Sequence, residues 1–338
     1  MFLKIQESAP NQEKIQETPP ATEKAAEKTE PQEENLFVRL LHHTQDSHEI
    51  ELPGMAVELP YLIFDEGSLH TFRNAEAIEE SGTYTLQQGK VLRKSDGHPA
   101  TLDISITKHI VFMWVAAVIL VIAAVTAAKR NRKSQVPKGI GNLVEVFVVY
   151  IRDEILLPNM GRAGLRYLPY LITTFFFILT MNLIGMVPYS ATATGNVNVT
   201  AGLAIIAFIM IQLSAIRAQG LGHYLMHLTG GVPWWLWPIM VPIEILGLFT
   251  KPFALCIRLF ANMTGGHIVI VSLMGMIFLF KSYVLAPVPV FFALGINMLE
   301  LFVAFLQAYI FTMLTSLFMG LGLQAAHAEG ESHDEHAH

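Results

Sequence analysis

The sequence contains little charge and almost no cysteine. Only 15% of its 338 residues are charged, whereas 52% are hydrophobic and the mean hydropathy is +0.44. A soluble protein carries about 25% charged residues. The single cysteine, Cys256, excludes an intrachain disulfide and a zinc site built from cysteines. The low charge and the high hydrophobic content indicate a protein that spans a membrane several times.

Several functional motifs are also missing. There is no basic stripe or RNA-reading motif, which argues against nucleic-acid binding. We find no phosphate-cradling glycine loop, no nucleotide motif and no Ser/His/Asp set, so we expect a non-catalytic chain without a cofactor. The first residues, MFLKIQESAPNQEK, lack the apolar region of a secretory signal.

The remaining composition predicts an all-α polytopic membrane domain at 109–323, between polar ends. Residues 1–35 have the composition of a disordered tail, and residues 324–338 form an acidic, His-rich tail. Residues 36–108 mix β-branched and aromatic residues with Pro and Gly, which predicts a small β-rich module outside the membrane. The predicted spans are 109–128, 165–187, 199–218, 233–280 and 288–323, with an interfacial amphipathic helix at about 139–157.

The distribution of basic residues predicts the orientation. The connection 129–166 contains Lys129, Arg130, Arg132, Lys133, Lys138, Arg152, Arg162 and Arg166, whereas 188–198 contains no Lys or Arg. Cytoplasmic loops are enriched in basic residues. We therefore expect the N-terminal region outside and the C-terminus in the cytoplasm.

The last two predicted spans are too long to stand upright in a bilayer. A helix over 233–280 would be about 70 Å long, against a hydrocarbon core of about 30 Å. Pro238, Pro242 and Pro252 should kink its beginning. We expect two strongly tilted helices that form an antiparallel hairpin around 281–287 and face a curved partner.

Polar residues inside these apolar helices are the candidate functional site. Arg258 and Asn262 share a helix face, as do Glu300 and Gln307, whereas His267 lies on the face opposite Arg258. In an antiparallel hairpin, one register places Arg258 beside Gln307 and His267 beside Glu300. Such a layout is typical of a proton path that ends at an arginine.

Structural explanations compete with this interpretation. Arg258 could extend to the headgroups, His267 could be a packing histidine, and Asn262 with Gln307 could only join helices. Glu300 is harder to explain structurally, since a carboxylate within a span is functional by default.

The other histidines form no convincing metal site. His42, His43 and His48 lie in a polar loop, and the C-terminal tail is expected to be solvated. His223 and His227 are four residues apart but have no carboxylate beside them, which favours an interfacial turn. We predict no metal.

Two segments give the chain a family resemblance. KPFALCIRLFANMTGGHIV (251–269) and NMLELFVAFLQAYIFTML (297–314) resemble subunit a of F-type ATP synthases over about 109–323. The chain departs at Ala261, where Gly is usual, and in FALCIR, where the family has Ser-Leu. The 36–108 module resembles an extension in subunits from Bacteroidetes and green sulfur bacteria, which implies a bacterial plasma membrane.

The resemblance implies a function in proton translocation. Arg258 would face the carboxylate of a rotating c-ring, with Asn262 one turn on and Gln307 beside it. His267 and Glu300 would line a half-channel from outside, and Glu244 would lie toward the cytoplasmic half-channel. Implied partners are the c-ring, b-type peripheral stalk subunits and, indirectly, the catalytic head, within membrane lipid.

Two other classes of protein remain as alternatives. A stand-alone proton-coupled secondary transporter should show inverted repeats, and none is found in the sequence. A membrane redox enzyme would need facing histidine pairs for haem. The sequence leaves H⁺ and Na⁺ both open as the coupling ion.

Overall fold

The computed structural model describes residues 48–335 apart from short internal segments. Those segments are 53–54, 66, 88–89, 96, 134–138, 188–189, 229–232 and 281–285. The predicted disordered tail at 1–35, His42 and His43 therefore lie outside the described residues, as does most of the predicted hairpin turn.

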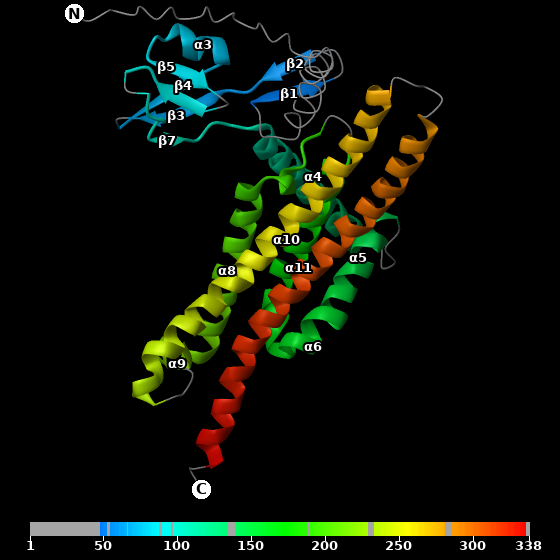
Figure 1. Cartoon of the computed structure of the whole chain (residues 1–338). Coiled ribbons are helices and arrows are strands. Elements are labelled where there is room, and N and C mark those ends of the chain that lie inside the picture. The colour runs from blue at the N-terminus through cyan, green and yellow to red at the C-terminus, as the bar shows by residue number, and fades with distance from the viewer. Residues whose placement is uncertain are drawn as a thin grey trace, which may run out of the picture.

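The N-terminal part is a small β-rich module, as expected from its composition. Its strands are β1 (Glu49–Leu52), β2 (Met55–Glu58), β3 (Tyr61–Asp65), β4 (Ser68–Phe72), β5 (Tyr84–Gln87), β6 (Lys90–Arg93) and β7 (Leu102–Asp103), with helix α3 (Ala75–Glu80) between β4 and β5. The strands pair antiparallel as β1-β2, β4-β3-β7 and β5-β6. Alternate residues of β3 point inward, where Tyr61 and Ile63 pack with Ile78, Tyr84 and Val91. Figure 1 shows this module above the ends of the helices.

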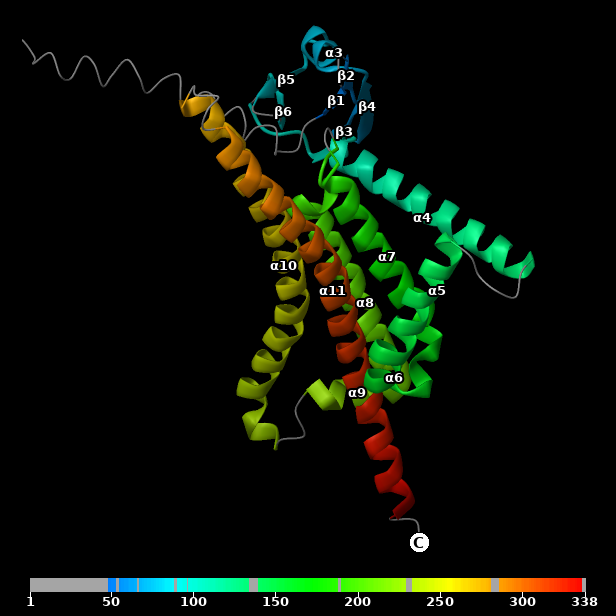
Figure 2. The same cartoon turned by 90° about the vertical axis from the view of Figure 1, so that its right-hand side faces the viewer.

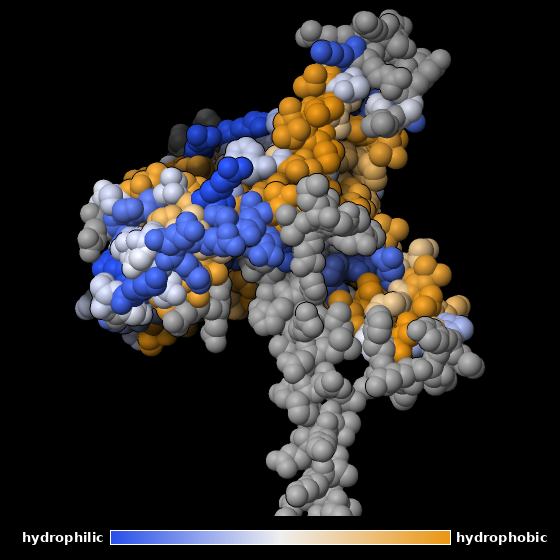
Figure 3. Space-filling view, turned by 90° about the horizontal axis from the view of Figure 1, so that it is seen from above, coloured by the Kyte–Doolittle hydropathy of each residue, from blue (hydrophilic) through white to orange (hydrophobic). Residues whose placement is uncertain are grey.

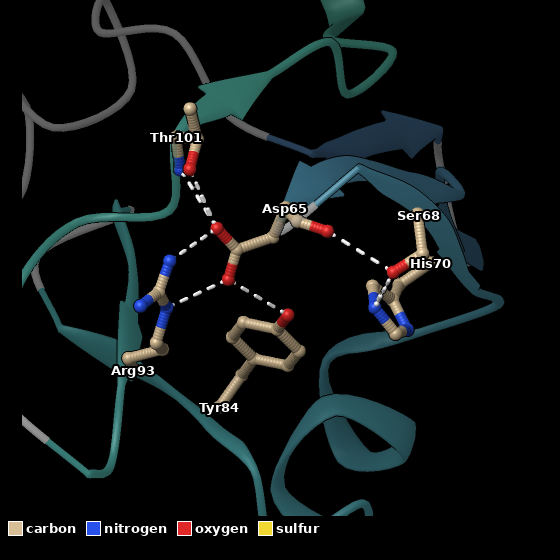
Figure 4. Close-up of polar contacts among 6 residues, drawn as sticks. All are labelled: Asp65, Ser68, His70, Tyr84, Arg93 and Thr101. Atoms are coloured by element: carbon tan, nitrogen blue, oxygen red, sulfur yellow. Dashed lines mark hydrogen bonds and ion pairs between the residues drawn. The ribbon is translucent and has the colours of Figure 1, made fainter.

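A buried carboxylate joins three parts of the module. Asp65, at the end of β3, accepts hydrogen bonds from Arg93 Nε at 2.7 Å, Tyr84 Oη at 3.0 Å and Thr101 Oγ1 at 2.7 Å (Figure 4). Its partners come from β6, β5 and the segment before β7. The hydrogen bonds from Arg93 and then Thr101 hold the pKa of Asp65 far below its usual range. The ionised carboxylate is therefore a structural centre of the module.

Replacing Asp65 with Asn should destabilise the module, because the Arg93 guanidinium loses the carboxylate with which it pairs. Since folding lowers the pKa of this carboxyl, its stabilising contribution is full above the unfolded pKa of about 3.9 and is lost as the pH falls further. Pulse proteolysis of the full chain measures both effects. The native module should stay resistant from pH 7 to pH 5 and the variant should be cleaved at pH 7. Equal resistance of the two at pH 7 would contradict the structural function of Asp65.

The rest of the chain is helical. Its elements are α4 (Lys108–Lys133), α5 (Ile140–Tyr150), the π-helix η1 (Ile151–Leu156), α6 (Leu157–Met160), the 3₁₀-helix η2 (Arg162–Tyr167), α7 (Leu168–Gly185), the 3₁₀-helix η3 (Ala193–Gly195), α8 (Val197–Gln219), α9 (Leu221–Leu228), the 3₁₀-helix η4 (Trp234–Leu236), α10 (Trp237–Phe280) and α11 (Pro287–Glu335). Five stretches are long and apolar enough to cross a membrane: Lys108–Lys129, Arg162–Gly185, Val197–Gln219, Trp234–Ile277 and Pro287–Leu323. The predicted class, a polytopic helical protein, is confirmed.

Small residues let the central helices approach closely. A Cβ added to Gly322 of α11 would lie 2.8 Å from Ala215 Cβ of α8, and one on Gly320 would lie 2.1 Å from the Asn159 carbonyl oxygen. Lipid is as apolar as the helices, so close packing and hydrogen bonds have to hold membrane helices together. Fully buried aromatic rings such as Phe175 and Phe311 fill the core between α7, α8 and α11.

The segment predicted as an interfacial helix packs into this core. Phe147 of α5 contacts Phe175 and Phe305, and Ile155 of η1 is fully buried. Within the π-helical turn, the Ile155 carbonyl oxygen accepts a hydrogen bond from Asn159 Nδ2 at 2.8 Å. Figure 2 shows α5 descending beside α7. Its predicted placement along the membrane interface stays a prediction.

Helices α10 and α11 form the expected long hairpin. They run side by side in opposite directions (Figures 1 and 2). With 44 residues, α10 is about 66 Å long, and Pro242 and Pro252 lie inside it. Helix α11 continues to Glu335, so the backbone of 324–335, predicted as a tail, is helical.

Candidate functional site

The centre of the candidate site is a histidine–carboxylate pair between α10 and α11. His267 Nδ1 lies 3.1 Å from Glu300 Oε1, and the Glu300 residue is only 5% exposed. On the other side of the ring, His267 Nε2 lies 3.4 Å from Thr192 Oγ1. The predicted pairing of His267 with Glu300 is confirmed.

Space for the carboxylate comes from a glycine on the facing helix. A Cβ added to Gly266 would lie 3.1 Å from both Cδ and Oε1 of Glu300. A side chain at this position would therefore press on the carboxylate. A Cβ added to the neighbouring Gly265 would meet nothing within 4 Å. Of these two glycines, only Gly266 therefore leaves room that Glu300 needs.

Two amides meet farther along the same hairpin. Asn262 Nδ2 donates to Gln307 Oε1 at 2.9 Å, and Gln307 is 2% exposed. The register predicted from the sequence placed Gln307 beside Arg258. The observed partner of Gln307 is instead Asn262, one helical turn after Arg258. Among the described residues, Gln307 Nε2 has no hydrogen-bond partner although it is buried. One buried donor thus remains available on the α11 side of the site.

Arg258 lies on the exposed face of α10. Its neighbours Leu255, Cys256 and Leu259 are buried against the bundle, where Cys256 Sγ lies 3.4 Å from Thr200 Oγ1 of α8. In the part of the chain that the structure describes, Arg258 has no hydrogen bond or ion pair. A charge within a span is costly unless it meets a partner or water. The exposed face of α10 therefore presents an uncompensated cation.

Glu244 lies on the other side of Arg258 along α10. It is 14 residues before Arg258, about 21 Å along the helix, whereas His267 is nine residues after it, about 14 Å. The Tyr224 hydroxyl of α9 donates to Gln212 Oε1 at 2.7 Å. Burial raises the pKa of Tyr224, and the nearby Glu244 carboxylate raises it further. Titratable groups thus lie on both sides of the fixed cation.

Uncharged polar residues that sequence reasoning did not single out complete the site. Asn182 of α7 is fully buried, donates to the Ala304 carbonyl oxygen at 3.1 Å and accepts from Thr194 Oγ1 at 2.8 Å. It thereby fixes α11 between Glu300 and Gln307. Thr192 connects the turn before η3 to His267. In the sequence, the only sign that these polar residues belong to the site was that they lie between apolar residues. Polar residues in that position commonly serve helix packing alone.

The fold and these groups define a polytopic membrane protein of the ion-translocating class. The family model described as ATP synthase A chain matches residues 110–320. The chain is 57% identical to ATP synthase subunit a of Chloroherpeton thalassium over 239 residues, 70% of each chain. It is 55% identical to that of Myxococcus xanthus, covering 70% of this chain and 78% of the relative. With that of Anaeromyxobacter sp. the identity is 44% over 326 residues, 93% of this chain and 77% of the relative.

The chain therefore belongs to the ATP synthase A chain family, and the resemblance inferred from 251–269 and 297–314 is confirmed. It is a membrane-embedded, multi-pass component of an F-type ATP synthase, with the role of its proton-translocating stator subunit.

Proposed function

We propose that the chain provides two offset half-channels that deliver protons to the carboxylates of a c-ring and take them away. Proton flow is thereby coupled to rotation and ATP synthesis, while the chain itself performs no covalent chemistry. The observation that carries this proposal is the contact between His267 and the buried Glu300, on a hairpin whose exposed face presents Arg258. A buried carboxylate beside imidazole can accept a proton and pass it on.

On the outer side, a proton passes from His267 to Glu300 and then neutralises a ring carboxylate. The neutral site can turn into lipid, which an ionised carboxylate could not enter without a large desolvation cost. Thr192 and Gly266 position the pair, Thr192 by its contact with the His267 ring and Gly266 by leaving room for Glu300.

Arg258 separates the two half-channels. A ring carboxylate that arrives beside the guanidinium is driven to ionise, because a nearby cation favours the charged form. Arginine keeps its proton, so protons cannot cross it from one path to the other. Two observations support the assignment of Arg258 as the barrier: its side chain is exposed, and the amides of Asn262 and Gln307 lie one helical turn along the same hairpin.

On the inner side, the released proton leaves past Glu244. Each proton that crosses about 100 mV supplies about 2.3 kcal/mol. The distribution of basic residues supports a cytoplasmic position for this half-channel in a bacterial inner membrane, with the N-terminal module outside.

The ring is proposed to dock on the exposed apolar face of α10 and α11. Phe253, Ile257, Met298 and Phe302 are large, apolar and exposed on these two helices. Seen from above, hydrophobic residues cover the helices while hydrophilic ones gather over the β-module (Figure 3). The b-type stalk subunits contact the remaining lipid-facing helices in this proposal.

Cross-linking tests the docking face. In the assembled complex, a cysteine at Ala261, exposed and one turn from Arg258, should form a disulfide with a cysteine placed beside the ring carboxylate and should stop ATP-driven pumping. Native Cys256 is the matched control, because it is buried on the opposite side of α10. Cross-linking through Cys256, or none through position 261, would contradict the proposed docking face.

A further inference from the structure

A small cavity with both polar and apolar lining lies between α4, the turn before η3, and α10. Its volume is about 80 Å³. Its polar lining residues are Lys108 and His109 of α4, Ser190 and Thr192 of the turn, and Thr264 and His267 of α10. A water molecule occupies about 30 Å³ in the liquid, so the cavity can hold water that bonds to these groups.

The cavity borders directly on the histidine–carboxylate pair. Thr192 Oγ1 lies 3.4 Å from His267 Nε2, and the opposite nitrogen of that ring lies 3.1 Å from Glu300. His109, which also lines the cavity, is 4% exposed and lies at the beginning of the first membrane helix. Two histidines from helices far apart in sequence therefore line the same cavity.

The charges that face the cavity suit a proton better than a metal cation. Its described titratable wall groups are Lys108, His109 and His267, and the carboxylate of Glu300 lies behind His267. None of the described wall residues is acidic. Among the described wall residues Na⁺ would find hydroxyl groups and imidazoles but no carboxylate ligand, whereas a proton can move through hydroxyls, water and imidazole.

We propose that this cavity is the outer mouth of the half-channel and that His109 is its proton-collecting group. The proton binds one imidazole nitrogen of His109, moves through water and Thr192 to His267, and reaches Glu300. This inference rests on the proposed function of the His267–Glu300 pair. Imidazole suits the task, since its ordinary pKa of about 6.5 lets it bind and release a proton near neutral pH.

Passive proton conduction through membrane vesicles stripped of the catalytic head tests His109. His109→Gln, which cannot carry a proton, should lower conduction roughly tenfold at pH 8, an added barrier of about 1.4 kcal/mol, and less at pH 6. His109→Glu should restore much of it, because Glu is again titratable. The matched control is His98→Gln, an exposed histidine of the module. Unchanged conduction in His109→Gln at pH 8 would overturn the assignment.

A second experiment tests the cavity independently of His109. Cells carrying Ser190→Cys are treated from outside with a membrane-impermeant thiol reagent before vesicles are prepared. Cys256 is buried, so the native chain serves as the control. Labelled Ser190→Cys should conduct poorly; full conduction after complete labelling would show that protons enter elsewhere.

A third variant, Glu300→Gln, distinguishes failure of the cavity assignment from failure of the proposed function. If Glu300→Gln blocks conduction while both cavity experiments leave it intact, this inference is wrong and the proposed function stands. If Glu300→Gln conducts like the native chain, Glu300 is not on the path and the proposed relay through the His267–Glu300 pair fails.

Discussion

Replacing Arg258 with alanine should abolish ATP-driven acidification of inverted membrane vesicles without loss of the subunit from the membrane. Arg258 is exposed and has no described partner in the chain, so its removal should change folding stability by no more than about 0.5 kcal/mol. Pumping should fail because no cation remains to drive the arriving ring carboxylate to ionise.

Two further variants sharpen this prediction. Arg258→Lys keeps a positive charge but supplies a group that loses its proton when desolvated, so it should pump far less than the native chain. Arg73→Ala removes an exposed arginine of the β-module and should leave pumping unchanged. Normal pumping by Arg258→Ala at equal assembly would mean that the arginine only extends to the headgroups.

Replacing Glu300 with glutamine should reduce ATP-driven pumping by roughly 10²-fold, the usual contribution of a positioned proton-transfer group. Glutamine has nearly the same size and can still bond His267, so packing is preserved while the titratable proton is lost. Exchanging the two residues, His267→Glu with Glu300→His, should restore part of the activity because the pair is rebuilt at the same contact.

A pair of glycine variants perturbs the same contact by geometry alone. Gly266→Ala presses on the Glu300 carboxylate and should lower pumping, whereas Gly265→Ala meets nothing within 4 Å and should not. Equal pumping in Glu300→Gln and the native chain would remove Glu300 from the path.

The charged part of the site could be predicted from sequence because charge in an apolar helix is costly. Glu300, His267 and Arg258 were evident on that ground alone. The hairpin register placed His267 beside Glu300 correctly, since these positions lie on facing sides of two helices at the same height. It placed Gln307 one turn from its observed partner, Asn262, because a simple hairpin register cannot fix the pairing along two long helices to within a turn.

The uncharged part of the site depends on packing between distant segments. Asn182 reaches a carbonyl oxygen 122 residues away, and no local pattern encodes that contact. The π-helical turn at Ile151–Leu156 contacts α7 and α11, and no local pattern in the sequence predicted it. In the β-module, β-branched and aromatic residues between Pro and Gly predicted a β-rich structure, but no local pattern predicted that Arg93, Tyr84 and Thr101 converge on Asp65.

The most direct test of the account is the passive proton conductance of head-stripped vesicles that contain Arg258→Ala beside an intact c-ring. If Arg258 separates the two half-channels, its loss should join them, so the vesicles should leak protons under an imposed potential faster than native stripped vesicles. A conductance equal to or below the native value, at equal subunit content, would contradict the assignment of Arg258 as the barrier between the two paths.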